Sequence, residues 1–504
     1  MFNKIFSKSI LVITGIFILL ATIIISHVVY VGGFSFWYDP ARDLLSALAN
    51  SSKLTLIGPP SGIPGLFYGP YWIWFLSLAQ VFSKDPRLIT FLVATIPYLV
   101  VFPFILSRFS SVISYSSLSI IWLIFILGFI NYFTDLWNPH PAPLFILLTI
   151  YLLFLKTNTV DLRNLVITFL AGFFAGIVMN FQLSFGIGMI FGLIIFMISE
   201  VIYKSYNKKF ELKRVLKNFI LVLLFIFGSI VSFTPFILFE ARHEFNQTKV
   251  LINAFTHYGE VVSQTGLAKI QIIQLLIDRV GNVLHIPFIV SVTLLVLGLI
   301  FIFRKASKKI KTQNTKLVII LISILFGVLC VYLTARNPVW VYHLIGAEVI
   351  ILLLIGVILD KIKILKYIVG FWVLILFSYF LFNQIQSWNN NPQNIYGTLA
   401  AEKGIVDKIN KDSKNQKYVV FAYSPAIYTY EYSYLFKLLY NKDVPYQPEL
   451  NPTDGKLVFL IFPPETEKAK KEDFINYRTP PSMYKTEKET IQRNGAQVII
   501  RVKF

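Results

Sequence analysis

The chain has 504 residues, of which 56% are hydrophobic and only 14% are charged, whereas soluble proteins carry about 25% charged residues. Many apolar runs approach the length that crosses a bilayer, so the composition excludes a soluble enzyme, a disordered chain and a nucleic-acid-binding protein. The 46 Lys and Arg residues outnumber the 26 Asp and Glu residues, and their positions favour a membrane-orientation signal. The single cysteine, Cys330, excludes a disulfide framework and a thiolate metal cluster. The sequence therefore predicts a polytopic membrane protein.

Twelve segments come near the length of about twenty apolar residues that a transmembrane helix requires. In chain order they are 9–32, 66–82, 88–107, 113–133, 141–156, 164–181, 183–203, 218–239, 284–303, 317–335, 342–359 and 367–384. The first is too long for a cleaved signal peptide and has no small-residue cleavage site after it. We interpret it as a retained anchor, with Lys4 and Lys8 on the cytoplasmic side.

Three basic loops set the predicted orientation. Loops 204–217 and 304–316 each contain six Lys or Arg residues, and loop 360–366 contains three lysines, so all three are expected in the cytoplasm. This requires one early segment not to cross. Segment 66–82 is short, contains a Gly-Pro pair and is rich in Tyr and Trp, which prefer the membrane interface. We expect it to lie on the outer face, which leaves eleven transmembrane helices with the N-terminus inside and the C-terminus outside.

The last part of the chain differs in composition from the apolar part. Residues 385–504 are more polar and alternate helix-like with strand-like stretches. The expected helices are 400–412 and 430–441, and the expected strands are 417–423, 456–462 and 497–504. We therefore expect a transmembrane domain over 1–384, with a large first external loop over 33–87, and a small extracytoplasmic α/β domain over 385–504.

The first external loop opens with two carboxylates. Asp39 and Asp43 are four residues apart, which places them on one face of a short helix with Arg42 beside them. Apolar surroundings would strengthen any charge interaction that they make. A solvated helix cap at the membrane edge is the simpler explanation of this spacing taken alone.

Other polar or conformationally special segments lie on the same predicted face. Four prolines and four glycines within 58–70 dictate backbone shape around Tyr68, as a fixed cover over a cavity or as a turn into the interfacial helix. Asp135 and His140 flank a tight link that could position a substrate or hold a metal, but two ligands are too few for a metal site, and a polar cap is the commoner explanation.

Two further external segments carry basic side chains. One contains Glu240, Arg242 and His243, and the other contains Arg336 and His343. Arginine with neighbouring donors suits a phosphate group, although anionic lipid headgroups would attract the same residues. Within the helices, the sequence offers two carboxylates, Glu200 and Glu348, without an obvious partner for either. The sequence contains no P-loop, Rossmann glycine pattern, H-E-x-x-H or G-x-S-x-G motif.

Taken together, these features resemble the GT-C class of membrane glycosyltransferases, which includes protein O-mannosyltransferases and aminoarabinose transferases. The shared pattern is a first helix, a large external loop that opens with an acidic motif, a Pro/Gly-rich stretch with an aromatic interfacial helix, and a later external motif. In this chain the acidic motif is 38–43, the Pro/Gly-rich stretch and the aromatic segment are 58–60 and 68–72, and the later external motif is 135–140. The resemblance covers most of the membrane region and, more loosely, the C-terminal domain.

The resemblance implies a catalytic role for Asp39, as general base or as the carboxylate that binds the acceptor. Many relatives have a second acidic residue directly after it, where this chain has Pro40, so Asp43 is the candidate to replace that group. The donor implied is a sugar on a polyprenyl phosphate, taken from the outer leaflet. The side chains expected to contact substrate or its phosphate are Arg42, Tyr68, Asp135, His140, Glu240, Arg242, His243, Arg336 and His343.

The resulting hypothesis is a glycosyltransferase of the cytoplasmic membrane that moves the sugar to a glycan, lipid or protein acceptor by inverting displacement. No cofactor is predicted with certainty, and a divalent metal is left open. Two alternatives belong to other classes of protein. A transporter or flippase of lipid-linked sugars would need paired intramembrane charges, and a non-catalytic envelope-assembly protein would depend on residues 385–504 but not on Asp39.

Overall fold

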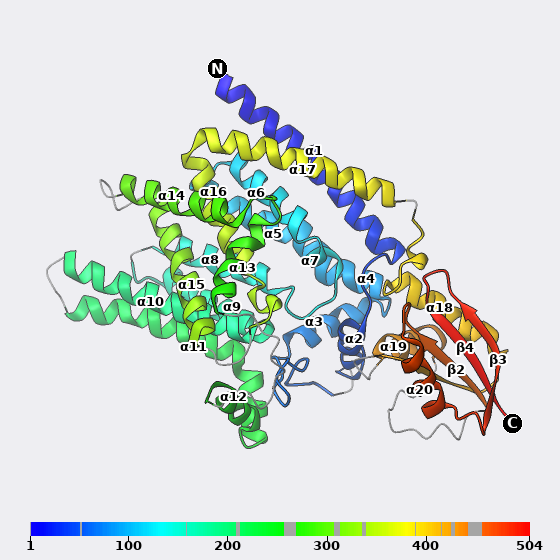
Figure 1. Ribbon diagram of the computed structural model, residues 1–504. Coiled ribbons are helices and arrows are strands. Elements are labelled where there is room, and N and C mark those ends of the chain that lie inside the picture. Colours follow the sequence, from blue (N-terminus) through cyan, green and yellow to red (C-terminus); the bar gives the residue numbers. More distant parts are fainter. Residues whose placement is uncertain are drawn as a thin grey trace.

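The computed structural model of the protein describes most of the chain. The described residues are 2–50, 53–157, 159–207, 212–256, 269–306, 313–334, 339–388, 390–414, 416–424, 429–441 and 456–504. The structure is largely helical, with a small sheet near the C-terminus. Figure 1 shows that α1 and α17 lie together along one side of the helical part, and that the sheet lies at one end of the molecule.

The first half of the chain contains an N-terminal helix, two short helices of the first loop and a series of apolar helices. Their bounds are α1 Phe2–Val31, α2 Tyr38–Asn50, α3 Tyr71–Phe82, α4 Pro86–Thr90, η1 Phe91–Thr95, η2 Pro97–Val101, α5 Phe102–Ser107, η3 Arg108–Ser111, α6 Tyr115–Gly128, α7 Asn131–Thr134, α8 Ala142–Leu155, α9 Leu162–Phe181, α10 Leu183–Asn207 and α11 Leu212–Arg242.

The second half continues the bundle and ends in alternating helices and strands. Their bounds are α12 Asn246–Thr256, α13 Lys269–Gly281, α14 Phe288–Ala306, α15 Gln313–Thr334, η4 Val341–Leu344, α16 Ala347–Lys361, α17 Lys363–Ser387, η5 Pro392–Asn394, α18 Leu399–Asp412, β1 Tyr418–Ala422, α19 Tyr430–Tyr440, β2 Leu457–Phe462, α20 Lys468–Arg478, β3 Tyr484–Ile491 and β4 Gln497–Lys503.

Helices occupy all twelve segments predicted from hydropathy. Among the described residues, seven helical segments are long and apolar enough to cross a membrane, and other apolar helices, such as α6 and α8, are shorter. The chain is therefore a multi-pass membrane protein, while the count of eleven crossings stays a prediction. Helix α3 has 12 residues, and at 1.5 Å per residue it is about 18 Å long, too short to span the bilayer. Loops 204–217 and 304–316 lie partly outside the described residues.

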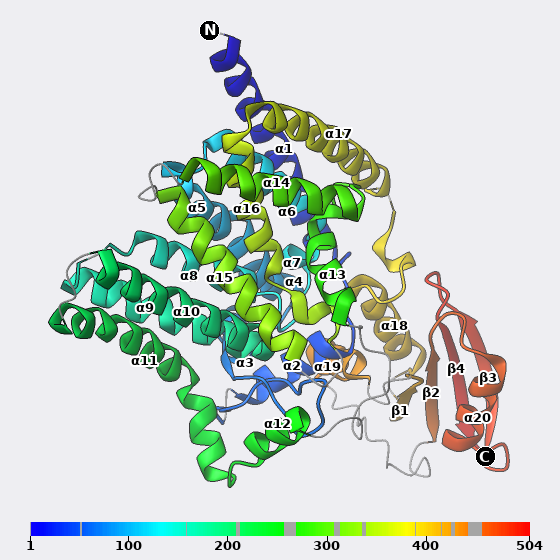
Figure 2. The same cartoon turned by 60° about the vertical axis from the view of Figure 1, so that its left-hand side comes forward.

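The long helices pack closely where they carry glycine. Figure 2 shows α9, α10 and α11 side by side. A Cβ at Gly192 of α10 would lie 2.0 Å from the Ser323 carbonyl oxygen of α15. Likewise, a Cβ at Gly327 of α15 would lie 2.2 Å from the Gly188 carbonyl oxygen of α10. Small residues let the backbones of membrane helices approach closely. The van der Waals contacts that result stabilise helix association in lipid, where the hydrophobic effect does not act between helices.

Both carboxylates within the helices have partners that the sequence did not reveal. Glu200 on α10 accepts a hydrogen bond of 2.5 Å from Lys156 Nζ, and Glu348 on α16 forms a 2.9 Å ion pair with Arg279 Nε of α13. Each partner is distant in the sequence, so only the packing of helices reveals the pair. Pairing is the usual way in which a buried charge is tolerated at such positions.

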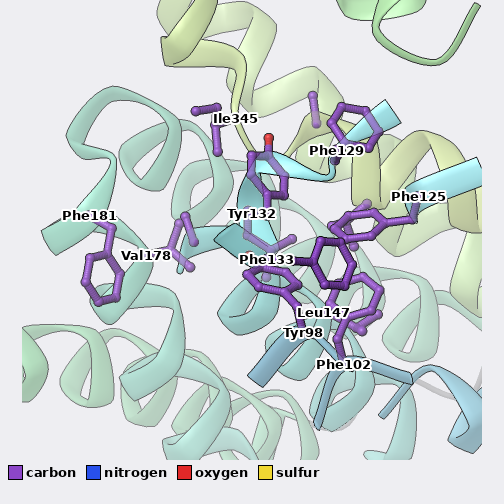
Figure 3. Close-up of a cluster of buried hydrophobic side chains, with 14 of the residues drawn as sticks. Tyr98, Phe102, Phe125, Phe129, Tyr132, Phe133, Leu147, Val178, Phe181 and Ile345 are labelled. Carbon is purple, nitrogen blue, oxygen red and sulfur yellow. The ribbon is translucent and has the colours of Figure 1, made fainter. Parts of the chain in front are cut away.

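An aromatic cluster fills the centre of the bundle. Figure 3 shows Tyr98, Phe102, Phe125, Phe133 and Tyr132 packed together. Phe102 and Phe125 stack with centroids 4.5 Å apart, and Tyr98 donates a hydrogen bond to the backbone carbonyl of His140. Tyr98 belongs to η2, one of two consecutive π-helical turns, a conformation that occurs frequently at functional sites. The cluster thereby fixes the loop that contains His140.

The C-terminal residues form a four-stranded mixed sheet in the order β1-β2-β4-β3. Strands β1 and β2 are parallel, with Tyr418 opposite Leu457, and the other two pairings are antiparallel. Three predicted strands and both predicted helices are present near their expected bounds, whereas α20 and β3 were not predicted.

Helix α19 joins this part of the chain to the first loop. Tyr430 packs against Tyr38 with ring centroids 5.2 Å apart, and Tyr434 donates a 2.6 Å hydrogen bond to the Lys84 carbonyl. Ser35 also forms an isolated antiparallel bridge with Thr398. In both views α19 lies beside α2, between the helical bundle and the sheet (Figures 1 and 2).

The crossing of α10 and α15 generates a test of this packing. We expect Gly192→Ala to destabilise the purified protein by about 1–3 kcal/mol, because the added methyl group meets a backbone carbonyl that cannot move alone. Thermal unfolding in detergent would measure the change. Gly15→Ala is the matched control, since a Cβ there meets nothing within 4 Å; equal stability of the two variants would contradict the described crossing.

Candidate active site

A single guanidinium lies between the two carboxylates of α2. Arg42 forms ion pairs of 2.7 Å with Asp39 Oδ1 and of 2.7 Å with Asp43 Oδ1. The indole nitrogen of Trp72, at the start of α3, donates a 2.9 Å hydrogen bond to the other oxygen of Asp43. The helical spacing predicted this cluster, because residues three and four apart share a face.

Burial sets the protonation of both carboxylates. Asp43 is fully buried, and this burial raises its pKa to about 7, although Arg42 acts in the opposite direction. Burial also raises the pKa of Asp39 above its usual range, while Arg42 and a hydrogen bond with Trp137 lower it. Asp39 keeps some exposure, with 21% of its side chain accessible. It is therefore the carboxylate of the pair that a substrate can reach.

The external motif around Trp137 lies next to α2. Besides its hydrogen bond with Asp39, the Trp137 ring lies 6.3 Å from the ring of Trp37, 5.3 Å from that of His140 and 5.8 Å from that of Tyr342. The structure thus brings together three segments that are distant in the sequence: the start of α2, residues 135–140 and η4.

His140 and Asp135 are both largely buried in this motif. The Nδ1 atom of His140 lies 3.3 Å from the backbone carbonyl of Asp135, which can only accept, so Nδ1 carries the proton and Nε2 is left as an acceptor. Burial lowers the pKa of His140 to about 3 and raises that of Asp135 to about 6. His140 is therefore a neutral imidazole at physiological pH.

The Pro/Gly-rich stretch forms a turn that is held by hydrogen bonds and lies near Tyr342. Tyr68 exchanges backbone hydrogen bonds of 2.8–2.9 Å with Gly58 and Pro59, and the amide of Phe67 donates to Gln247 Oε1 at 2.7 Å. Burial raises the pKa of Tyr68, so its hydroxyl stays protonated. A Cβ at Gly62 would lie 3.0 Å from the Tyr342 hydroxyl, which places the turn against η4.

His343 is the second histidine near this cluster. Its Nδ1 accepts a 3.1 Å hydrogen bond from the Trp340 amide, so the proton sits on Nε2. Burial lowers the pKa of His343 to about 4. It would therefore act on a phosphate as a neutral hydrogen-bond donor and not as a cation.

The remaining predicted substrate ligands that the structure describes lie at the end of α11 and just after it. Glu240 is buried and accepts hydrogen bonds from the backbone amides of Gln247 and Thr248, so it caps the following helix. Arg242 and His243 are exposed, and His243 stacks on its neighbour Phe239 with centroids 3.9 Å apart. Arg336 lies outside the described residues.

A buried polar network adjoins the site and was only partly anticipated. Arg279 donates to Glu348 Oε2 at 2.9 Å, to the Tyr132 hydroxyl at 3.0 Å and to the Val341 carbonyl at 3.2 Å. Figure 3 shows the Tyr132 hydroxyl pointing away from the aromatic cluster. The Tyr132 ring lies 4.7 Å from that of His140. The one sequence signal for Arg279 is a basic residue at the end of an otherwise amphipathic helix.

An apolar groove runs between α3, the π-helical turns and α8. Its volume is about 320 Å³. The lining residues are almost all apolar, and Leu78 and Phe82 are 64% and 72% exposed. Tyr98 and Pro141 line it as well, so the groove extends to the residues next to His140. Its apolar lining suits a hydrocarbon group.

The chemistry that these side chains can perform is proton transfer and anion binding. Asp39 is a partly accessible carboxylate whose pKa is raised by burial, and a raised pKa makes a carboxylate a stronger general base. Within the described residues, no group of three or more His, Cys, Asp or Glu side chains is placed to hold a metal ion.

The architecture is a polytopic membrane fold like that of a solved crystal structure. The structure of the chain is similar to the crystal structure of ArnT from Cupriavidus metallidurans bound to undecaprenyl phosphate, with a TM-score of 0.59, 9% sequence identity and coverage of 98% of each chain. ArnT is an aminoarabinose transferase of the GT-C class. No protein-family model matches the sequence, and no curated protein matches it. The likeness therefore establishes the fold.

The buried carboxylate of Asp43 generates a pH prediction. Its folded-state pKa of about 7 lies above the ordinary 3.8, so the folded chain retains a proton that the unfolded chain releases. Its stabilising contribution is complete below about pH 4 and is lost as the pH rises to about 7. We expect Asp43→Asn to flatten the fall of the thermal midpoint between about pH 4 and pH 7. An unchanged slope relative to the exposed control Asp473→Asn would contradict the buried state of Asp43.

Proposed function

We propose that this protein is a glycosyltransferase that moves a sugar from a polyprenyl-phosphate donor to an acceptor hydroxyl on the extracytoplasmic face. The observation that carries the proposal is the Asp39–Arg42–Asp43 cluster, because it lies in a fold shared over 98% of the chain with a transferase crystallised with undecaprenyl phosphate. The apolar groove beside α3 supports a lipid-linked donor, since a polyprenyl chain dissolves only in the bilayer.

In the proposed reaction, Asp39 is the general base. The acceptor hydroxyl oxygen attacks the anomeric carbon while Asp39 takes the hydroxyl proton. The bond between the anomeric carbon and the phosphate oxygen breaks, its electron pair leaves with the polyprenyl phosphate, and the configuration of the sugar inverts. Arg42 holds the carboxylate in place through the 2.7 Å ion pair.

Hydrogen-bond donors around α2 would stabilise the phosphate as charge develops on it. His343 offers its Nε2 proton and Tyr68 offers its hydroxyl, and both side chains are uncharged for the reasons given above. The prenyl chain would lie in the groove lined by Phe75 and Phe145. Trp37 is 40% exposed and provides an aromatic face on which a sugar ring can stack.

A transporter of lipid-linked sugars is the second candidate. The two ion pairs within the bundle, Lys156–Glu200 and Arg279–Glu348, supply the paired intramembrane charges that this alternative requires. The two functions differ in one property: transfer proceeds in detergent solution, whereas transport needs two compartments.

The test is sugar transfer from lipid-linked sugars extracted from the native membrane. We expect Asp39→Asn to lower the rate at least about 100-fold, because the general base contributes 10²–10⁴-fold. The fold should be intact by thermal unfolding, and Asp473→Asn, at an exposed position of α20, should retain the wild-type rate. Equal turnover by Asp39→Asn and wild type would reject Asp39 as the base, and no turnover by the wild type with donor present would favour the transporter.

A further inference from the structure

A second cavity lies in the C-terminal part of the chain, away from α2. Its volume is about 410 Å³, within the range of small-molecule sites. It opens where the parallel strands β1 and β2 end, because Ala422 and Tyr423 of one strand end and Ile461 and Pro463 of the other line it. The carboxyl ends of parallel strands are the usual place for ligands in open α/β sheets.

One carboxyl oxygen in this cavity is buried without a hydrogen-bond partner among the described residues. The Oε2 atom of Glu431, in the first turn of α19, makes no hydrogen bond with any described residue. Burial raises the pKa of Glu431 to about 8, so the group is mostly a neutral carboxylic acid at pH 7. Such a group both donates and accepts a hydrogen bond. An unpaired buried polar atom of this kind costs free energy unless a ligand satisfies it.

Tyrosine side chains form much of the remaining wall. Tyr396, Tyr423 and Tyr432 all line the cavity. The Tyr432 hydroxyl makes no hydrogen bond with any described residue, and Glu402, which interacts with it electrostatically, accepts a 3.1 Å hydrogen bond from the Gly397 amide through Oε1. Burial raises the pKa of Glu402 to about 7. The wall therefore combines aromatic faces with hydroxyl and carboxyl groups that have unused hydrogen-bonding capacity.

The rim of the cavity is strained. Glu465, in the turn after β2, has a φ of +62°, which is costly for a residue with a side chain. Such strain concentrates at ligand clamps and active sites. The same turn is fixed by a 2.8 Å hydrogen bond from Thr466 Oγ1 to the Pro463 carbonyl, so the rim is preformed.

These features select one chemical class of ligand. A sugar ring offers an apolar face for tyrosine rings and hydroxyl groups for carboxyl and phenol groups. A cation would instead require Glu431 to ionise against its burial. We propose that this cavity binds a neutral sugar unit, and that, on the proposed transferase function, this unit is a part of the acceptor glycan remote from the reacting hydroxyl.

Helix α19 connects the cavity with the α2 cluster. Tyr430 and Tyr434, four residues apart on one face, contact Tyr38 and the Lys84 carbonyl, while Glu431 and Tyr432 line the cavity. A helix with its side chains is about 10 Å across. An acceptor that reaches both places must therefore contain more than one sugar unit, which makes the acceptor an oligosaccharide or a longer glycan.

The experiment measures binding of the full-length protein in detergent to printed oligosaccharides of neutral hexoses, pentoses and N-acetylhexosamines, with chitosan oligosaccharides as the cationic comparison. We expect the wild type to bind at least one neutral oligosaccharide. Glu431→Ala should weaken this binding at least tenfold, whereas Glu431→Gln should stay within threefold, because an amide replaces a neutral carboxylic acid.

Two further variants distinguish a loss of sugar binding from a loss of folding. Tyr396 is 38% exposed, so Tyr396→Ala leaves the core intact and should also weaken binding at least tenfold. Glu487→Gln, at an exposed position of β3, should bind like the wild type. The proposal is overturned if the wild type binds no neutral oligosaccharide, or binds only the cationic sugars. It is also overturned if Glu431→Ala and Tyr396→Ala bind normally, or if Glu431→Gln loses binding as Glu431→Ala does.

Binding to printed sugars requires no donor and no turnover. Sugar transfer by a wild type that binds no printed neutral oligosaccharide would therefore reject the cavity proposal alone. Binding lost in Glu431→Ala, in a protein that never transfers sugar, would reject the transferase function and leave the sugar-binding cavity standing.

Discussion

The placement of one arginine between a buried and a partly exposed carboxylate is the constraint on which the rest of the site depends. Asp43 is fully buried, and ionising it away from water is unfavourable unless Arg42 and Trp72 compensate. The same guanidinium fixes Asp39 through a second ion pair. Segments from α3, the 135–140 loop and α19 close around α2, and each contributes an aromatic side chain that excludes water and strengthens these electrostatic interactions.

Local patterns in the sequence predicted local features well. The apolar runs gave the helix positions, and the four-residue spacing of Asp39 and Asp43 placed them on one face of a helix. The hydrogen bond of Trp137 with Asp39 could not be predicted, because it depends on packing between segments about a hundred residues apart. The ion pair of Glu348 with Arg279 was missed for the same reason. Strand β3 was missed because it is an exposed edge strand with hardly any apolar alternation.

The two cavities differ in the polarity of the residues that line them. The groove beside α3 is apolar and is lined by exposed phenylalanine and leucine side chains, whereas the cavity beside α19 carries carboxyl and phenol groups. The Asp39 cluster lies on α2, which packs against both α3 and α19. This arrangement agrees with the proposed transferase, whose lipid-linked donor and glycan acceptor would need different environments. ArnT, whose fold the chain shares, was crystallised bound to undecaprenyl phosphate.

The most direct test of this account is a cryo-electron-microscopy structure of the protein with a polyprenyl-phosphate sugar bound. The account predicts the prenyl chain in the groove beside Phe75 and Phe145, with the anomeric carbon within reach of an acceptor hydroxyl held by Asp39. A lipid bound outside this groove, with its sugar away from Asp39, would contradict the central claim.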